Sequence, residues 1–356
     1  MSSTTGKHVL LTGASGFLAA WVLKYLLEQG FTVRATVRSQ SKADPIAAQY
    51  AAAVSSNQLT FAIVPDIVSP GAHDAAVKEL FADGQPLDFV VHTASPFHMG
   101  TTDPVSQMLE PAVKGTIGVL ESVHTHAPSV KRVVITSSAV AFLDLAKGPW
   151  PGKVYNESDW NPLTWEESAK PGNPMVNYVG SKTVAERAAW DFMEKATSKF
   201  DLVTLCPPFV FGPHSNDQSL DSLNTSNWVL WQLLSGSAAE VPPTSLHCWV
   251  DVSTAAQAHV MALTVPEAGG KRFYIGADEH WSFQDAADIF RDSFPRIRDK
   301  IAIGSPGTGL GIAYDDIFTI DNALSKQILG LKYSALRQTL IDTAESLLEL
   351  QEKKKA

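Results

Sequence analysis

A tyrosine and a lysine lie four residues apart in the segment Tyr178-Val179-Gly180-Ser181-Lys182. The residues that follow have helical patterning, so both side chains are expected on one face of a helix. A phenol has an ordinary pKa of about 10, and a neighbouring ammonium favours the phenolate, so the spacing predicts a lowered pKa for Tyr178. Such a phenol suits general acid–base chemistry. The pair alone is common, and a lysine whose stem covers a half-buried tyrosine is the simpler interpretation.

A serine pair gives the catalytic interpretation more weight. Ser137 and Ser138 come at the end of a predicted strand at 132–136. In an open α/β sheet, ligands bind beyond the carboxyl ends of the strands, where the hydroxyl of Ser138 and a glycine turn at residue 13 should both lie. The three features together predict a proton-transfer site in one crevice.

The glycine turn follows the first apolar strand directly, as Gly13-Ala14-Ser15-Gly16-Phe17-Leu18. Its glycines permit a tight turn and close backbone approach, and the free N–H groups of the next helix would face a pyrophosphate. The spacing is G-x-x-G-x-x-A, and a plain tight turn is the alternative. The position between a strand and an amphipathic helix favours dinucleotide binding.

The end of the second predicted strand indicates which dinucleotide binds. An NAD site would carry an acidic residue there, but residues 29–43 contain no Asp or Glu and instead supply Arg34, Arg38 and Lys42. Arg38 can form a bidentate contact with a 2′-phosphate and Lys42 can add a point charge, so we expect NADPH or NADP+ as the cofactor. Alternatively, all three are solvated surface residues.

Short apolar runs alternate with helical patterns over the first 206 residues. This alternation, with strands buried on both faces, predicts an α/β fold with a Rossmann-type doubly wound parallel sheet. We expect residues 1–206 to form the NADP-binding domain with the catalytic residues. Residues 207–356 are expected to form a smaller mixed α/β substrate lobe that includes the strand at 272–275, and some of its elements could return to the first domain. The other strands are expected at 9–12, 32–37, 59–64, 88–92, 132–136 and 202–206, and the main helices at 43–54, 73–82, 105–125, 177–197, 221–234, 253–264, 282–294 and 334–352.

Composition and charge exclude several classes of protein. The chain has 356 residues, of which 45% are hydrophobic and 18% charged, and it is too apolar for a disordered protein. With 28 basic and 37 acidic residues its net charge is −9, so nucleic acid and anionic membranes are not expected partners. No run of about 18 apolar residues occurs, so no membrane span is expected. The two cysteines, Cys206 and Cys248, lie in apolar stretches, which suits reduced thiols and a cytoplasmic location.

Nearly the whole chain resembles the extended short-chain dehydrogenase/reductase family. Several stretches are similar to the family's fungal NADPH-dependent carbonyl reductases of the methylglyoxal/3-methylbutanal reductase type, and plant dihydroflavonol reductases are more distant. The stretches that carry the closer resemblance are 38–42 (RSQSK), 65–67 (PDI), 91–97 (VHTASPF), 110–116 (EPAVKGT), 207–213 (PPFVFGP) and 223–226 (LNTS).

The resemblance implies three catalytic roles. Tyr178 would donate a proton to the carbonyl oxygen, Lys182 would lower the pKa of Tyr178 and hold the nicotinamide ribose, and Ser138 would hydrogen-bond the carbonyl. Ala112 stands where many relatives have a catalytic Asn. Cofactor contacts are implied for residues 13–18 at the pyrophosphate, Arg38 and Lys42 at the 2′-phosphate, Asp66 and Ile67 at the adenine, Thr93, Ala94 and Ser95 along the middle, Pro207 and Val210 by the nicotinamide, and Ser226 near the phosphates.

The residues expected to face the substrate are all apolar: Phe97, Ala139, Leu143, Met175, Phe209 and Trp228. An apolar pocket favours a small ketone or aldehyde with aliphatic or aromatic flanks over a sugar nucleotide, whose diphosphate needs Arg or Lys. Any one of these residues could equally be ordinary core. The sequence therefore predicts an NADPH-dependent reductase that converts ketones and aldehydes to alcohols.

Two other functions are compatible with the same fold. One is a sugar-nucleotide epimerase or dehydratase, although the residues after Ser138 lack the Val-Tyr-Gly that epimerases usually carry. The other is a non-catalytic NADP sensor, although such proteins typically lack the catalytic tyrosine. No metal is predicted, because the close pair His124 and His126 is best explained as a solvated helix end. The family resemblance also implies a homodimer formed through the helix of Lys182 and its neighbour.

Overall fold

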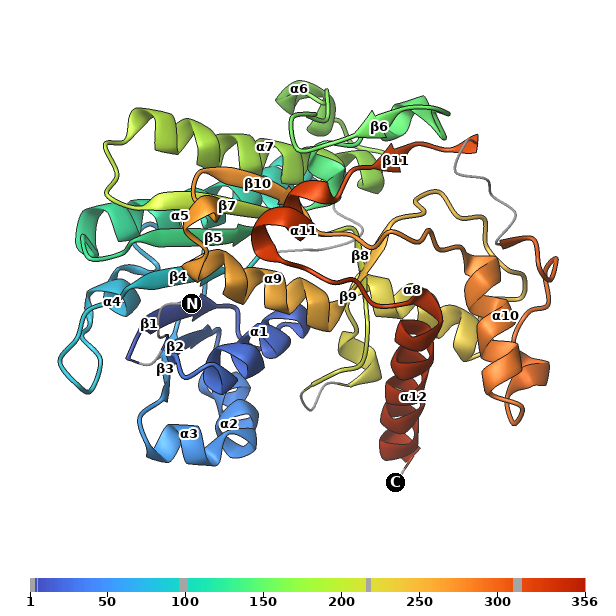
Figure 1. The fold of residues 1–356 in the computed structure, drawn as a ribbon, viewed down its shortest axis with the longest axis horizontal. Coiled ribbons are helices and arrows are strands. Elements are labelled where there is room, and N and C mark those ends of the chain that lie inside the picture. The colour runs from blue at the N-terminus through green and yellow to red at the C-terminus, as the bar shows by residue number, and fades with distance from the viewer. Residues whose placement is uncertain (1–3, 5, 96–101, 216–218, 310–315, 356) are drawn as a thin grey trace.

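A parallel sheet of seven strands forms the centre of the molecule (Figure 1). The computed structural model describes residues 4, 6–95, 102–215, 219–309 and 316–355, and in it the strand order is β10-β7-β5-β4-β1-β2-β3. The order reverses between β1 and β4, so the ligand crevice of a doubly wound sheet is expected beyond their carboxyl ends. The strands are β1 (His8–Thr12), β2 (Thr32–Val37), β3 (Leu59–Ile63), β4 (Phe89–His92), β5 (Arg132–Thr136), β7 (Asp201–Cys206) and β10 (Lys271–Tyr274).

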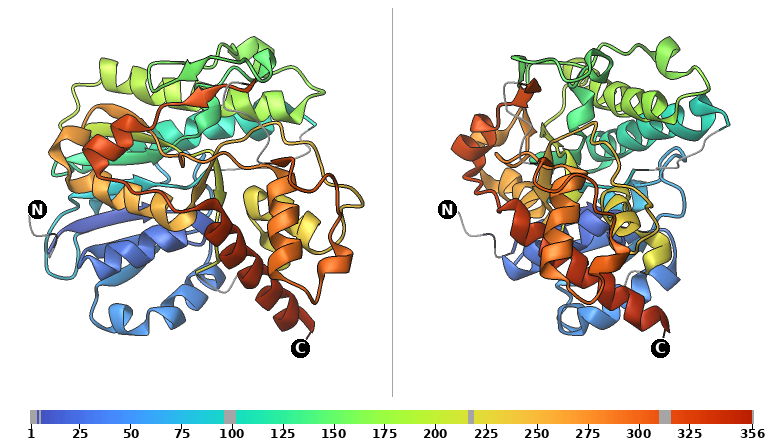
Figure 2. Two further views of the ribbon diagram at one scale, coloured as in Figure 1. Left: turned by 45° about the vertical axis from the view of Figure 1, so that its right-hand side comes forward. Right: turned by 90° about the vertical axis from the view of Figure 1, so that its right-hand side faces the viewer.

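Helices cover both faces of this sheet, as the turned views in Figure 2 show. Side chains of β1 alternate between the faces, because Val9 and Leu11 pack in one apolar cluster and Leu10 packs in another. The predicted doubly wound fold is therefore confirmed. The first cluster includes α1 (Phe17–Glu28), α2 (Gln40–Gln49), α9 (Val252–Thr264) and α11 (Ala323–Leu329), and the second includes α4 (Asp74–Lys78), α5 (Glu110–His126) and α7 (Pro174–Lys195).

A smaller lobe lies beside the carboxyl end of β7 (Figure 1). Its core surrounds the buried indoles of Trp249 and Trp281. The lobe contains the paired strands β8 (Phe209–Phe211) and β9 (Trp249–Asp251) and the helices α8 (Thr225–Leu234), α10 (Phe283–Ser293) and α12 (Leu336–Lys355). A second short pair joins β6 (Val154–Tyr155) to β11 (Thr319–Ile320).

The structure differs from the predicted elements in several places. The strand predicted at 272–275 is β10, which pairs with β7 in the central sheet and not with the lobe. The helix predicted at 43–54 is two helices, α2 and α3 (Ala51–Ser55), and the one predicted at 73–82 is the five-residue α4. The helix predicted at 105–125 begins with a π-helical turn at Val105–Leu109 before α5.

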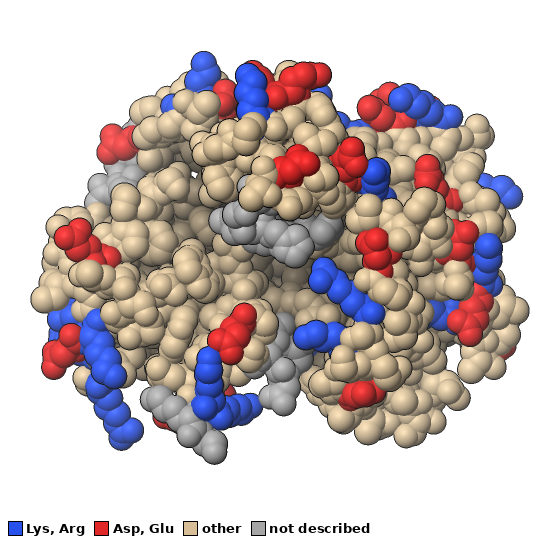
Figure 3. All heavy atoms as spheres, turned by 180° about the vertical axis from the view of Figure 1, so that it is seen from behind, with Lys and Arg blue, Asp and Glu red and all other residues tan. Residues whose placement is uncertain are grey.

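Charged side chains of both signs are interspersed over the face shown in Figure 3. This distribution fits the absence of a basic stripe from the sequence. Among the described residues, no helix combines the length and the apolarity needed to cross a bilayer.

Candidate active site

The turn after β1 is fixed in place by its neighbours. Gly13 has a φ of +70°, and a Cβ added there would lie 3.0 Å from the Cα of Ala94. Only glycine is suited to this combination of positive φ and close backbone approach. The N–H of Gly13 donates to Oγ1 of Thr36 at 3.2 Å, and the N–H of Ala14 donates to the carbonyl of Thr36 at 3.0 Å. The end of β2 therefore holds the turn.

A buried network beneath the turn was not predicted from the sequence. Oγ1 of Thr12 lies 2.9 Å from Nδ1 of His92 and accepts the N–H of Ala94 at 3.2 Å. Oγ1 of Thr93 donates to the carbonyl of Thr12 at 2.5 Å. Burial lowers the pKa of His92 to about 3, so the ring is neutral at physiological pH. The network joins the carboxyl ends of β1 and β4 at the point where the strand order reverses.

The amino end of α1 has the features of a phosphate-binding helix start. Gly16 is its N-cap, no side chain caps it, and no acidic residue lies in its first turn. Gly16 is exposed and Ser15 is half-buried, whereas Ala14 and Phe17 are buried. The first N–H groups of α1 thus have no side-chain cap and can bind an anion. Together with the turn at Gly13, they fit a dinucleotide pyrophosphate.

The three cations near the end of β2 do not share one environment. Arg34 is only 4% exposed, and its guanidinium donates to the carbonyls of Ala76, Glu79 and Leu80 at 2.7–3.0 Å. The interpretation of Arg34 as a solvated surface residue is wrong, because its buried side chain holds the end of α4. Arg38 and Lys42 are exposed, and they flank the start of α2.

Tyr178 and Ser138 come together at the carboxyl end of β5. Asn173 caps α7 by accepting the N–H groups of Met175 and Val176 at 3.1 and 3.2 Å, which sets Tyr178 in the second turn of the helix. Ser138 begins the 3-10 turn that follows β5, and its side chain lies close enough to the Tyr178 phenol to lower the pKa of that phenol. The hydroxyl of Ser137 instead donates to Glu186 at 2.7 Å, so the two serines have different partners, as strand alternation predicts.

Lys182 lies one turn beyond Tyr178 on α7. Its Nζ donates to Oγ of Ser95, which follows β4, at 3.0 Å. Burial lowers the pKa of Lys182 to about 8, because the charged ammonium loses hydration there. The side chains of Ser95, Ser138, Tyr178 and Lys182 therefore converge beyond β4 and β5, beside the turn at Gly13.

The pKa of Tyr178 differs from the prediction. Burial raises it above the ordinary value, and the hydrogen bond from Ser138 offsets only part of that shift. The expected lowering by the lysine one turn away is not found, because loss of hydration of the phenolate is the larger effect. At neutral pH the phenol therefore carries its proton.

The other predicted cofactor positions lie after β3, between β7 and β8, within β8 and at the start of α8. Asp66 is exposed after β3, and its carboxylate accepts Val68 N–H at 2.9 Å and Ser69 Oγ at 3.0 Å. Ile67 lies against Gly115 of α5, where an added Cβ would be 3.1 Å from its Cδ1. Oγ of Ser226, at the start of α8, accepts the N–H of Val210 at 3.1 Å, and the carbonyl of Pro207 accepts the N–H of Ala139 at 3.0 Å.

The predicted substrate positions fall into three groups. Ala139 and Leu143 have no exposed surface and pack in a core cluster with Phe142 and Tyr274, so a substrate would reach them only by displacing neighbours. Met175 and Trp228 are each 49% exposed, and Phe209 is half-buried. Phe97 lies outside the described residues.

The histidine pair at the end of α5 is divided between two partners. Nε2 of His126 lies 3.1 Å from the Asp74 carboxylate, and Nδ1 of His124 lies 3.2 Å from Oγ of Ser198. Asp74 is a nearby carboxylate that the sequence did not indicate. Among the described residues, no group of three or more His, Cys, Asp or Glu side chains could hold a metal ion.

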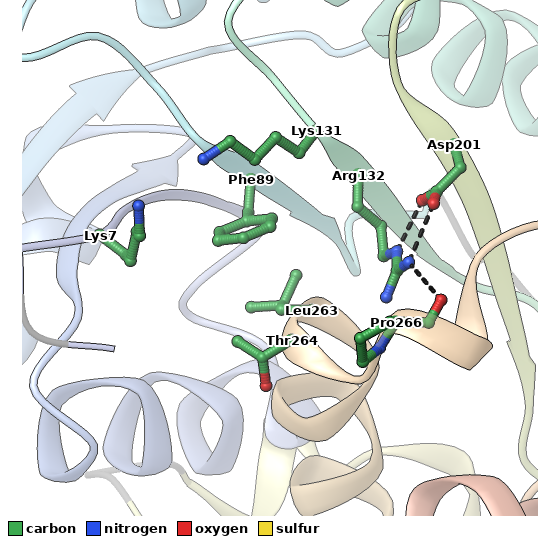
Figure 4. A pocket seen from close by; sticks show the side chains of 8 residues that line it. All are labelled: Lys7, Phe89, Lys131, Arg132, Asp201, Leu263, Thr264 and Pro266. Atoms are coloured by element: carbon green, nitrogen blue, oxygen red, sulfur yellow. Dashed lines mark hydrogen bonds and ion pairs between the residues drawn. The ribbon is translucent and has the colours of Figure 1, made fainter. Parts of the chain in front are cut away.

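A cavity of about 360 Å³ lies at the opposite, amino-terminal ends of the strands (Figure 4). Arg132 projects into its wall, and its guanidinium donates to both carboxylate oxygens of Asp201 and to the carbonyls of Ala262, Val265 and Pro266. These bonds use all five N–H donors of the guanidinium, so the arginine closes the end of α9 and has none left for a ligand. The lining residues are Lys7, Phe89, Lys131, Arg132, Asp201, Leu263, Thr264 and Pro266.

The sheet order, the turn at Gly13 and the Tyr178–Lys182 spacing define a family of dinucleotide-dependent enzymes. Residues 9–276 match the model of the NAD dependent epimerase/dehydratase family, and the chain belongs to this family, that of the extended short-chain dehydrogenases/reductases. This membership confirms the resemblance found in the sequence.

Individual relatives match the chain over nearly its whole length. The ketoreductase azaE of Aspergillus niger is 38% identical over 348 residues, which cover 96% of this chain and 98% of that protein. The NADPH-dependent methylglyoxal reductase GRE2 of Saccharomyces cerevisiae is 35% identical over 352 residues, again 96% of this chain and 98% of that protein. The structure of yeast methylglyoxal/isovaleraldehyde reductase Gre2 complexed with NADPH matches with a TM-score of 0.89 at 34% identity and covers 97% of this chain and 99% of that one.

Proposed function

We propose that this protein reduces small ketones and aldehydes to alcohols with NADPH. The observation that carries the proposal is the approach of Ser138 to Tyr178, with Lys182 one turn away and bonded to Ser95, in the crevice beside the turn at Gly13. Relatives named as a ketoreductase and as an NADPH-dependent methylglyoxal reductase support the same activity.

The residues described fit a bound NADPH. The N–H groups at the start of α1 would hold the pyrophosphate, Arg38 and Lys42 the 2′-phosphate, and Lys182 the nicotinamide ribose. When bound, the cofactor supplies the hydride, and the residues of the chain hold and protonate the substrate. The exposed apolar side chains of Met175 and Trp228 suit substrates with aliphatic or aromatic flanks.

The polar residues act on the carbonyl oxygen. Ser138 donates a hydrogen bond to this oxygen, which orients the carbonyl and stabilises the charge that develops on it. The Tyr178 hydroxyl transfers its proton to the same oxygen, and its raised pKa means that the proton is present at neutral pH. Lys182, one turn away on α7, would favour the phenolate that remains once its ammonium faces that phenolate in the loaded site.

The cytoplasmic location and the homodimer predicted from the sequence belong to this proposal. Cys206 and Cys248 are both free and buried, which supports a reducing compartment. The packing of α7 against α5 brings together the two helices through which we expect the second copy to dock.

The proposal is tested by the loss of NADPH absorbance with a panel of ketones and aldehydes, with chiral analysis of the alcohols. Tyr178→Phe is expected to lower kcat by about 10²–10⁴-fold, the range for loss of a general acid. Tyr50→Phe, which removes a hydroxyl at the end of α2, should leave kcat unchanged. Tightly retained NAD with no net consumption of NADPH would instead favour the epimerase alternative.

A further inference from the structure

Glu186, a carboxylate that the sequence analysis did not single out, is buried on the helix of the candidate catalytic residues. It lies on α7 one turn beyond Lys182 and two turns beyond Tyr178, so the three side chains share one face of the helix. The residue is only 3% exposed. A buried carboxylate needs a compensating charge and hydrogen bonds, and its partners therefore show what it holds in place.

Trp190 of the same helix donates to Oε1 of Glu186 at 3.4 Å, and the partners outside the helix come from three neighbouring strands. Its Oε1 accepts Thr204 Oγ1 of β7 at 2.7 Å and Arg272 Nε of β10 at 2.7 Å. Its Oε2 accepts Ser137 Oγ, just after β5, at 2.7 Å and Arg272 Nη2 at 3.2 Å. The carboxylate thereby joins α7 to all three strands.

Arg272 is itself held on its other sides. Its Nη1 donates to the carbonyls of Glu157 and Asp159, both at 2.8 Å. Its guanidinium carbon lies 3.7 Å from the ring centroid of Trp160, a cation–π contact. Because Arg272 is fixed in this way, its ion pair holds the carboxylate of Glu186 in one position.

Among these partners, Ser137 immediately precedes the candidate catalytic residue Ser138 in the chain. Its N–H donates to the carbonyl of Leu205 at 2.7 Å, and the next residue, Ser138, begins the turn whose Ala139 N–H donates to Pro207. The hydroxyl bond to Glu186 thus ties the end of β5 to the helix that carries Tyr178. We infer that Glu186 is a positioning residue, which acts through Ser137 to fix Ser138 opposite Tyr178. The inference rests on the proposed function only for its kinetic consequence.

The direct substitution Glu186→Gln is a poor test, because it would leave the buried charge of Arg272 uncompensated and the protein would be expected to fold badly. Ser137→Ala removes the link to the catalytic strand end and keeps the ion pair. Thr204→Val is its matched control, since it removes the other hydroxyl that donates to the same carboxylate, from a strand position that does not adjoin Ser138.

The first measurement is steady-state kinetics with NADPH and a carbonyl substrate that the wild type reduces, well below the Tm of each variant. Ser137→Ala is expected to lower kcat at least about tenfold, as small misplacements of reacting groups do, with KM for both substrates within about twofold. Thr204→Val should lose a similar amount of thermal stability and keep the kcat of the wild type. Equal losses of kcat in the two variants, or none in Ser137→Ala, would overturn the inference.

The second measurement does not depend on turnover. The carbon-13 signal of the hydroxyl-bearing ring carbon of Tyr178, assigned by its loss in Tyr178→Phe, reports on the contact of the phenol with Ser138. This signal should shift in Ser137→Ala and stay unchanged in Thr204→Val, and an unchanged signal in both variants contradicts the inference. If the wild type reduced no carbonyl compound, the proposed function would fail while this signal still decided the role of Glu186.

Discussion

Arg38 and Arg34 are four residues apart, and burial separates their roles. Arg34 is enclosed by three carbonyls, whereas Arg38 is exposed where a 2′-phosphate would lie. Arg38→Ala is expected to raise KM for NADPH about 10–100-fold, since charge-assisted hydrogen bonds contribute ~1.5–3 kcal/mol. KM for NADH should not change. Arg337→Ala, an exposed arginine on α12, is the control, and an equal effect on both cofactors would contradict the role of Arg38.

Burial of the Lys182 ammonium in the candidate site lowers the stability of the folded chain. Its pKa is about 8 in the folded chain, against about 10.4 when unfolded, because burial disfavours the ammonium. Lys182→Met should therefore abolish turnover yet raise the free energy of unfolding at pH 7 by on the order of 1–2 kcal/mol. Lys195→Met, on the exposed last turn of the same helix, should have little effect on either quantity.

The sign of the pH dependence follows from the lowered pKa of Lys182. Between pH 8 and about 10.4 the unfolded chain binds a proton that the folded chain does not, so the wild type gains stability as pH rises. The gain in free energy of unfolding that Lys182→Met provides is full below pH 8 and decreases between pH 8 and about 10.4. Thermal melts at pH 7 and pH 9.5 measure the change, and an advantage that grows with pH would refute this explanation.

At the scale of elements, the turn between β1 and α1 depends on a glycine. Gly13→Ala faces both a positive φ and a backbone atom 3.0 Å from the new Cβ, whereas Gly84→Ala faces a φ of +76° with nothing within 4 Å. We expect Gly84→Ala to lose about 1 kcal/mol of stability and Gly13→Ala about 1–3 kcal/mol more. Only Gly13→Ala should weaken NADPH binding, measured by calorimetric titration. Equal NADPH affinities in the two variants would mean that the turn does not hold the cofactor.

The elements that the sequence predicted well are those whose signal is local. β2 (TVRATV) and β5 (RVVIT) are short runs rich in β-branched residues, and their bounds at 32–37 and 132–136 match the structure. The glycine turn and the Tyr178–Lys182 spacing are also local, so most of the candidate site could be found without coordinates. The burial of Arg34 could not, because it depends on carbonyls more than 40 residues away that no periodicity reveals.

At the scale of the whole molecule, contacts cross the boundary that the sequence suggested at residue 206. β10 extends the sheet beside β7, and α9 covers the face on which α1 lies. Arg272 of β10 also reaches Glu186 of α7, 86 positions earlier in the chain. Pairings of this range depend on the folded topology, which explains why the sequence placed the strand at 272–275 in the lobe and did not find Glu186.

These crossing contacts predict how the protein unfolds. Without residues 207–356, β7 would be an open edge, and Val203 and Leu205 would lose the cover of Ala258 and Leu263. We therefore expect one calorimetric transition for the full chain, with equal calorimetric and van't Hoff enthalpies, and an increase in Tm on addition of NADPH. A fragment of residues 1–206 should show no cooperative melting. Two separate transitions in the full chain, or a fragment that melts cooperatively and is stabilised by NADPH, would instead identify residues 1–206 as an independent domain.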